Sequence, residues 1–250
     1  MCYSVESSAK TTLYSLIAIA LLLQSSVPHF QWIAVSLIGW CGMQFAELLL
    51  WLTNPRDGCT PMNKLITLTL IPLVLFFQPF GTILGSFYVV PWNDCSASRK
   101  SFILWYSLAS LVVLLSYFYG NLNKLCTTVT RNGHLNWWPS SYAIPVAYLT
   151  WAVMILTPVF VLWDASYKAF LMLCLFPAFG FYYGLTTDSK ASVWCYYTSL
   201  TSLIAIVLYY LHKFKVYNIL QWNNIKRTRY IYTSLSHSLK WPIPKQTCVS

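Results

Sequence analysis

Long apolar runs are the feature that most constrains this chain. Seven of them follow one another between short polar segments, and most are close to the roughly 20 residues that a helix needs to cross a hydrocarbon core. They cover approximately residues 12–24, 30–52, 65–90, 101–120, 142–163, 169–185 and 193–211. Only 9% of the 250 residues are charged, whereas a soluble domain carries about 25%. Because lipid offers a backbone no hydrogen-bond partners, we predict an all-α integral membrane bundle of about seven transmembrane helices.

The distribution of Lys and Arg predicts how this bundle is oriented. If the C-terminus is cytoplasmic, ten basic residues fall on the inside and six on the outside, and seven of the ten follow residue 212. We therefore expect an outside N-terminus, a transmembrane domain over residues 1–212 and a basic cytoplasmic tail over residues 213–250. The tail supplies most of the net charge of +10, which suits an anionic lipid surface. The expected partner is the lipid bilayer and not nucleic acid.

Four of the eight cysteines fall at the outer face of this topology. They are Cys2, Cys59, Cys126 and Cys195. An even number of cysteines on an oxidising side is what two disulfides need, although the spacing leaves their pairing open. Unpaired thiols are one alternative, and a thiolate metal site is another. No Cys-x-x-Cys or His-x-x-His spacing supports a metal site, so we expect neither a metal nor a cofactor.

Glu47 is the one acidic residue that lies well inside an apolar run. Gln44, Glu47 and Trp51 are spaced so that they share one face of a helix. A charged side chain within a membrane is costly, and such residues usually face the interior of a bundle and take part in its function. Two interpretations stay open: a functional carboxylate, and a structural one that joins helices through hydrogen bonds.

Polar residues at the outer end of the bundle are the candidate neighbours of Glu47. They are Ser4, Glu6, Asn63, Thr67, His134 and Asn136. We expect a polar site centred on Glu47 and Gln44, covered by the N-terminal arm and by the loop around His134. His134 itself fits a surface position as well as that of a ligand or base. Trp137 and Trp138 in the same loop are typical of residues that anchor at lipid headgroups.

Five prolines lie inside the apolar runs and predict kinked or broken helices. The segments 79–85 and 177–184 each contain Pro, then Phe-Gly, then a second Gly four residues on. This match is consistent with an inverted repeat of three helices, of the kind that surrounds transport sites. The alternative interpretation is that Gly-x-x-x-Gly brings two helices into close contact.

Several short motifs occur in order along the chain. They are Met1-Cys2-Tyr3-Ser4, Met43-Gln44-x-x-Glu47-x-x-x-Trp51, Cys59-x-x-x-Asn63, Gly133-His134-Leu135-x-Trp137 and Trp194-Cys195. Together they resemble a diffuse family of uncharacterised multi-span membrane proteins of large DNA viruses and microbes, whose members begin Met-Cys-x-Ser. The resemblance covers residues 1–195 and implies a grouping, with no activity to carry over. Its motif residues coincide with the expected outer-face site.

Three function hypotheses stay open. No P-loop, dinucleotide-binding, Gly-x-Ser-x-Gly or His-Glu-x-x-His motif occurs. The first hypothesis is a transporter or channel-like protein for a small solute or ion, with Glu47 as its titrating or cation-binding group. The second is a structural or interaction protein of a viral or organelle membrane, and the third is an intramembrane lipid-modifying enzyme with Glu47 and His134 as an acid–base pair. A carboxylate inside the membrane beside proline-broken helices favours the first.

Overall fold

The computed structural model describes residues 4–89, 92–121, 126–137, 182 and 190–214. Its helices are α1 (Val5–Leu23), α2 (Pro28–Leu52), α3 (Pro61–Leu65), α4 (Ile71–Val89), α5 (Ala97–Asn121), α8 (Lys190–Ser199) and α9 (Thr201–Lys213). A π-helical turn, η1 (Ile66–Leu70), joins α3 to α4, and a 3-10 turn, η2 (Trp92–Asp94), precedes α5. Strands β1 (Thr128–Val129) and β2 (Leu135–Asn136) form an antiparallel hairpin.

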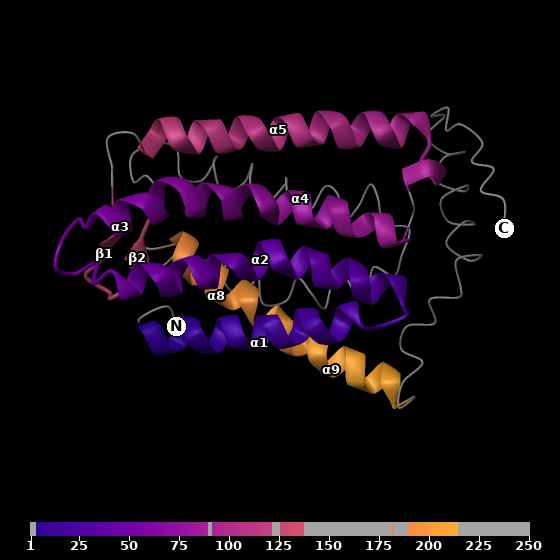
Figure 1. The fold of residues 1–250 in the computed structure, drawn as a ribbon, viewed down its shortest axis with the longest axis horizontal. Helices are drawn as coiled ribbons and strands as arrows, with labels where there is room; N and C mark the ends of the chain where they lie inside the picture. The colour runs from indigo at the N-terminus through magenta and orange to yellow at the C-terminus, as the bar shows by residue number, and fades with distance from the viewer. Residues whose placement is uncertain (1–3, 90–91, 122–125, 138–181, 183–189, 215–250) are drawn as a thin grey trace.

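The helices pack side by side with their long axes roughly parallel. Figure 1 shows a row in the order α5, α4, α2 and α1, with α9 crossing α1 at an angle. α8 packs against α2 and, over a smaller area, against α1. The hairpin and α3 lie at the same end of the row as the start of α1 (Figure 1). We call this the hairpin end.

Three of the described helical segments are long and apolar enough to cross a membrane. They are Pro28–Leu52 with 25 residues, Pro61–Tyr88 with 28 and Ser192–Lys213 with 22. These segments confirm helices over the predicted runs 30–52, 65–90 and 193–211. α1 and α5 are helices over the runs 12–24 and 101–120, while the runs 142–163 and 169–185 fall outside the described residues. The total of seven spans and their orientation remain predictions.

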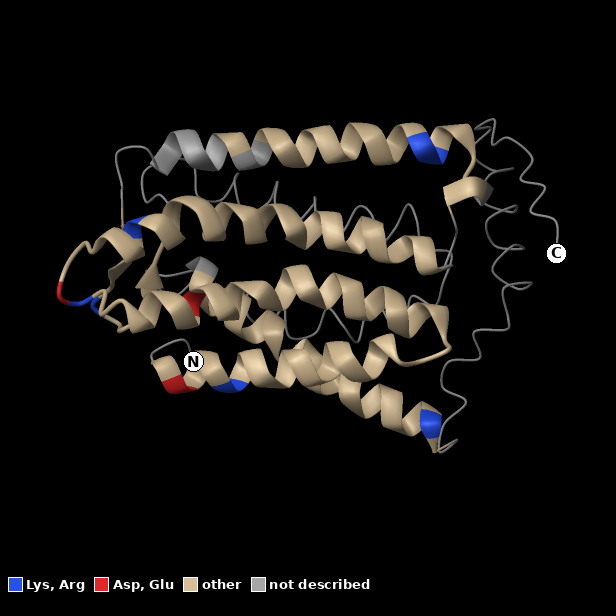
Figure 2. Cartoon of the chain, viewed as in Figure 1, with Lys and Arg blue, Asp and Glu red and all other residues tan. Residues whose placement is uncertain are grey.

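Charged side chains gather toward the ends of the described helices (Figure 2). α4 contains no charged residue along its whole length, and Glu47 is the only one in α2. This distribution is what a hydrocarbon environment imposes, because a charge near the centre of a bilayer is costly to accommodate. It makes the position of Glu47 an exception that requires an explanation.

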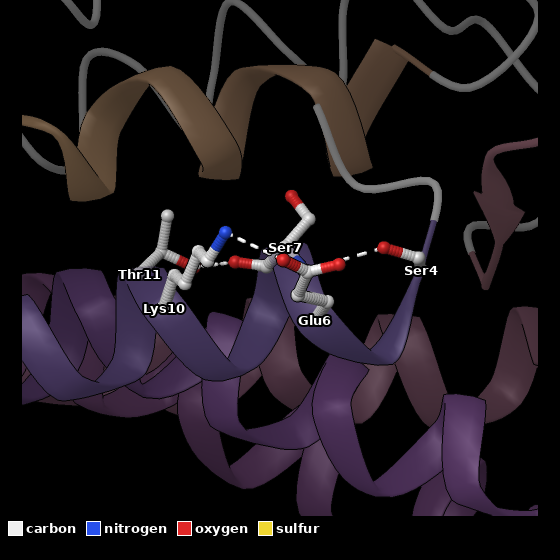
Figure 3. Close-up of polar contacts among 5 residues, drawn as sticks. All are labelled: Ser4, Glu6, Ser7, Lys10 and Thr11. Atoms are coloured by element: carbon white, nitrogen blue, oxygen red, sulfur yellow. Dashed lines mark hydrogen bonds and ion pairs between the residues drawn. The ribbon is translucent and has the colours of Figure 1, made fainter.

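Local contacts fix the start of α1. The Ser4 hydroxyl accepts a hydrogen bond of 3.2 Å from the backbone N–H of Ser7, which is the usual role of a serine before the first turn (Figure 3). Glu6 and Lys10 form an exposed ion pair of 2.6 Å one turn apart (Figure 3). Glu6 also sits in the first turn, where a negative charge suits the positive end of the helix dipole.

α2 and α4 form the most extensive helix pair of the described bundle because glycines let their backbones approach. A side-chain carbon at Gly85 would lie 2.7 Å from the carbonyl oxygen of Trp32, and one at Gly81 would lie 3.0 Å from that of Val35. A side-chain carbon at Gly39 of α2 would likewise clash with the backbone of Phe77. The close-packing interpretation of Gly81-x-x-x-Gly85 is therefore confirmed, while the segment 177–184 needed for the repeat lies outside the described residues, apart from position 182.

Prolines shape the helix that runs from residue 61 to 89. Pro72 has no N–H to donate to the carbonyl of Leu68, and its ring crowds that carbonyl. The π-helical turn η1 ends two residues before Pro72 and shifts the hydrogen-bond pattern to i→i+5 there. Pro79 lies inside α4. The prolines that were predicted to break this helix thus lie within one continuous helical segment.

Candidate functional site

The Glu47 carboxylate lies in the last two turns of α2 and is fully buried, with 0% of the residue exposed. The Gln44 amide donates a hydrogen bond of 3.1 Å to its Oε2 atom, and the Trp137 indole N–H donates one of 2.9 Å to its Oε1 atom. Each oxygen therefore has a described donor, and both donors are neutral. Donors of this kind offset part of the cost of removing a carboxylate from water.

Gln44 extends the site from α2 to α1. Its carbonyl oxygen lies 3.0 Å from the Thr11 hydroxyl, and Thr11 is also 3.0 Å from the backbone carbonyl of Ser7. Gln44 is 0% exposed and Thr11 3%. A continuous chain of polar contacts thus runs from Thr11 on α1, through Gln44 and Glu47 on α2, to Trp137 beyond the hairpin. The expected pairing of Gln44 with Glu47 is present in the structure.

Ser4 and Glu6, the predicted site residues of the N-terminal arm that the structure describes, make other contacts. In the described part of the protein, the Ser4 hydroxyl caps α1 and the Glu6 carboxylate pairs with Lys10 (Figure 3). Both Ser4 and Glu6 are exposed. The local helix-start contacts use these side chains, and it is Thr11, two turns further along, that reaches the site from α1.

Asn63 connects the start of the helical segment Pro61–Tyr88 to the hairpin. Its amide donates a hydrogen bond of 3.0 Å to the carbonyl oxygen of Thr127, and its own oxygen accepts one of 2.9 Å from the Thr127 backbone N–H. A side-chain amide can pair with a backbone peptide in this way because both carry one donor and one acceptor side by side. Thr67 adds a contact of 2.8 Å between the hydroxyls of Thr67 and Thr127. Asn63, Thr67 and Thr127 are all buried.

A disulfide fastens the same two segments. Cys59 and Cys126 are bonded, with a distance of 5.6 Å between their α-carbons and a sequence separation of 67 residues. This confirms the prediction for these two cysteines and identifies their pairing. A cross-link that closes a loop of this length stabilises by about 4 kcal/mol in the chain-entropy account. Cys2 lies outside the described residues.

Cys195, in contrast, is a free and buried thiol, so the prediction that it forms a disulfide is wrong. The physical reason is its place in the bundle. It lies inside the membrane-length segment Ser192–Lys213 and belongs to the same hydrophobic cluster as Trp137 and Cys41. A thiol packed between helices there has no loop cysteine beside it to pair with in the described structure.

The hairpin carries the remaining predicted residues. Asn136 pairs with Thr128 across the two strands, and the turn between them contains Gly133 at a φ of 77°, a conformation that favours glycine. His134 lies just after this turn and is 1% exposed, so it is a buried residue and not a surface one. Burial lowers the pKa of His134 and favours its neutral form.

Trp137 is the functional neighbour that the sequence reasoning assigned to the wrong role. A headgroup anchor would be partly exposed, but Trp137 is 1% exposed and binds Glu47. The overlooked signal is Asn132-Gly133, a dipeptide typical of hairpin turns, between the short runs that form β1 and β2. A hairpin predicted there would have placed the segment after β2 back against the helix bundle. Trp138 lies outside the described residues.

Trp51 shares the helix face of Glu47 but contributes differently. Its ring lies 6.0 Å from the guanidinium carbon of Arg56, which is a cation–π arrangement at the end of α2. Trp51 is buried, with 6% exposed. In the described residues its contact with Arg56 ties the loop after α2 back to the helix, and no hydrogen bond of its indole N–H is present.

One further buried polar residue of this part of the bundle, Gln78, was not predicted. Cys195 on α8 lies within electrostatic range of Glu47 and of the Cys41 thiol, with the Gln78 side chain beside it. Gln78 is the one amide side chain in α4 and is 0% exposed. A glutamine inside an apolar run was the available sequence signal. Within the described residues, no group of three or more His, Cys, Asp or Glu side chains is arranged to hold a metal ion.

Comparison of the chain with protein-family models, with curated proteins and with solved structures gives no match. The function must therefore be argued from the geometry around Glu47.

Proposed function

We propose that this chain is a multi-pass membrane protein that carries a small solute or ion through a polar site centred on Glu47. The observation that supports this proposal is the place of the carboxylate, which is fully buried in a helix of membrane-spanning length. Ionisable residues in such positions commonly mark ion pathways and proton relays in membrane proteins.

Nearby polar groups support the same proposal. Thr11, Gln44, Glu47, Gln78 and Cys195 come from four different helices, and all of them are buried. Purely structural contacts between membrane helices are more often made by small residues, such as the glycines that join α2 and α4. Amide, hydroxyl, thiol and carboxylate groups inside the bundle offer a solute replacements for its hydration shell.

The disulfide supports the proposed orientation. The bond between Cys59 and Cys126 lies at the hairpin end of the bundle, together with the start of α1. Disulfides persist in oxidising compartments and are rare on the cytoplasmic side of a membrane. The hairpin end is thus proposed to face outward, which agrees with the orientation that the Lys and Arg distribution predicts.

The test is a flux measurement on purified protein in phosphatidylcholine vesicles. Proton uptake would be followed with a trapped pH-sensitive dye under an imposed membrane potential, and methylammonium uptake with a radiolabel. We expect both the wild type and Glu47→Asp to exceed protein-free vesicles, and Glu47→Gln to fall to their level. Glu47→Gln must elute as a monodisperse peak with its Cys59–Cys126 disulfide intact. If such protein carries either probe as fast as the wild type, Glu47 has no transport role.

A second candidate function is that of a structural or interaction protein of a membrane. It is favoured by the hydrogen bonds on both Glu47 oxygens, because a carboxylate held by Gln44 and Trp137 also ties the region beyond the hairpin to α2. On this hypothesis the wild type carries neither probe. Glu47→Gln would then lower thermal stability and leave the vesicles as impermeable as before.

A further inference from the structure

The segment that carries the hairpin, residues 126–137, is attached to the helical part of the chain at both of its ends. At its start, Cys126 forms the disulfide with Cys59. At its end, the Trp137 indole N–H donates the hydrogen bond of 2.9 Å to the Glu47 carboxylate. A covalent bond and a bond to the buried carboxylate therefore act on the same short segment.

The register of the hairpin places these two ends beside each other. Thr128 pairs with Asn136 in the antiparallel ladder. The same register, continued by one residue, sets Thr127 opposite Trp137, and Cys126 is the residue before Thr127. Opposite residues of an antiparallel pair have α-carbons about 4.5–5.5 Å apart, so a displacement at the disulfide passes directly to the tryptophan.

The other described contacts at the start of the segment are weaker than the disulfide. Thr127 is joined to Asn63 and Thr67 by neutral hydrogen bonds of 2.8 to 3.1 Å. Each bond of this kind contributes about 1 kcal/mol net, because water replaces it when the segment leaves. While the disulfide is intact, a hairpin that leaves its place stays tethered and returns, which keeps the docked state dominant.

The disulfide is also open to reagents on one side. Cys59 is exposed, and so are residues 56–58 before it, whereas the described free thiols Cys41, Cys95 and Cys195 are buried. The bond lies at the hairpin end, which is proposed to face outward. Exposed disulfides are more readily reduced than buried structural ones and more often have a regulatory role.

We propose that the bond between Cys59 and Cys126 is a redox latch on Glu47. The intact bond holds Trp137 on the carboxylate and closes the site toward the hairpin end, and reduction by a dithiol releases the hairpin and opens the carboxylate to water. This inference rests on the proposed function and deepens it by naming how the site is regulated.

Reduction proceeds by two thiol–disulfide exchanges. A thiolate of the dithiol attacks the Cys59 sulfur, forms a mixed disulfide and releases the Cys126 thiolate, which takes up a proton. The second thiolate of the reductant then displaces the Cys59 thiolate, which is protonated in turn, and the reductant leaves as a cyclic disulfide. Two electrons and two protons thus pass from the dithiol to the cysteine pair.

The test measures access to Glu47 directly, on the full-length wild type in lipid nanodiscs. One sample would be reduced with dithiothreitol, alkylated with iodoacetamide and freed of reductant, and the other would receive iodoacetamide alone. A water-soluble carbodiimide with glycinamide then converts accessible carboxyl groups to amides, and mass spectrometry follows each peptide. We expect Glu47 to be labelled about tenfold faster in the reduced sample, which corresponds to about 1.4 kcal/mol of lost docking. Glu6, which is exposed and distant from the disulfide in sequence, is the internal control and should react equally in both samples.

Two controls separate release of the hairpin from general unfolding. Cys59→Ser/Cys126→Ser should label Glu47 at the fast rate with or without dithiothreitol. Hydrogen exchange should become faster in residues 126–137 after reduction and stay unchanged in the peptides of α2 and α4. Equally fast labelling of Glu47 in both samples, with the bond shown to be broken in one of them, would overturn the latch. Faster exchange throughout α2 and α4 would overturn it as well, because the protein would then have unfolded.

The proposed transport is decided separately by the flux measurement, repeated on oxidised and reduced vesicles. Proton flux that depends on Glu47 and rises after reduction supports both proposals. Flux and Glu47 labelling that are both independent of the redox state leave transport standing and reject the latch. Labelling that depends on the redox state, without flux in either state, rejects transport and leaves the latch as a property of the hairpin.

Discussion

The Trp137 indole N–H donates a hydrogen bond of 2.9 Å to Glu47 across 90 residues of sequence. This contact fastens the hairpin region to the bundle, together with the bonds of Asn63 and Thr67 to Thr127 and the disulfide between Cys59 and Cys126. A segment after the fourth apolar run is thereby held against the second and third helices of the chain. The position of the carboxylate and the position of the hairpin depend on each other.

Removing the indole N–H should weaken this arrangement. Trp137→Phe keeps an aromatic ring but leaves Glu47 Oε1 without that donor. We expect a loss of about 1.5–3 kcal/mol, the range for hydrogen bonds to charged groups. Thermal unfolding in detergent would measure it. Trp105→Phe on α5, where the tryptophan is 68% exposed, is the control and should change the midpoint little. An equal effect of the two substitutions would show that the bond to Glu47 contributes nothing.

Breaking the disulfide should also destabilise the protein. In the Cys59→Ser/Cys126→Ser variant, the loss is expected to approach the chain-entropy value of about 4 kcal/mol. Dithiothreitol should lower the unfolding midpoint of the wild type and have no effect on the double variant. A reductant effect of the same size in both proteins would place the sensitive bond elsewhere.

The glycines between α2 and α4 should differ sharply in their tolerance of alanine. Gly85→Ala places a carbon 2.7 Å from a backbone oxygen, whereas Gly42→Ala meets only the side chain of Val74, at 3.5 Å. Overpacking of this kind costs about 1–3 kcal/mol, so Gly85→Ala should unfold at a clearly lower temperature. Gly42→Ala should unfold near the wild-type temperature. The opposite order would mean that the backbones are not in close contact.

The stability of the hairpin region should depend on pH through His134. Burial lowers the pKa of His134 from the usual value of 6.5, so protonation favours the unfolded state. Its contribution is then complete above about pH 6.5 and is lost as the pH falls below this value toward the folded-state pKa. Unfolding midpoints of the wild type between pH 7.5 and about 5 should fall more steeply than those of His134→Gln. Parallel curves would exclude His134 as the titrating group.

Much of the local structure could be predicted from the sequence. Lipid excludes charge and forces the backbone to satisfy itself, so the apolar runs 30–52, 65–90 and 193–211 predicted helices that the structure contains. The same reasoning identified Glu47 as unusual and paired it with Gln44 one helical turn away. Each of these predictions depends on residues that are close together in the chain, where the length and spacing of a helix suffice.

The outcome was different where contacts join distant segments. The pairing of Cys59 with Cys126, the match between Asn63 and Thr127, and the burial of Trp137 on Glu47 depend on how the helices pack. The sequence left Cys195 a candidate for a disulfide and Glu6 a candidate for the site, because composition and topology assign residues to a face of the membrane and not to a neighbour. The apolar runs therefore determine by themselves that the described segments are helices, since that depends on local hydrogen bonding and solvation. Only the tertiary structure decides which polar groups meet around Glu47, because that depends on the packing of helices whose contacts span most of the chain.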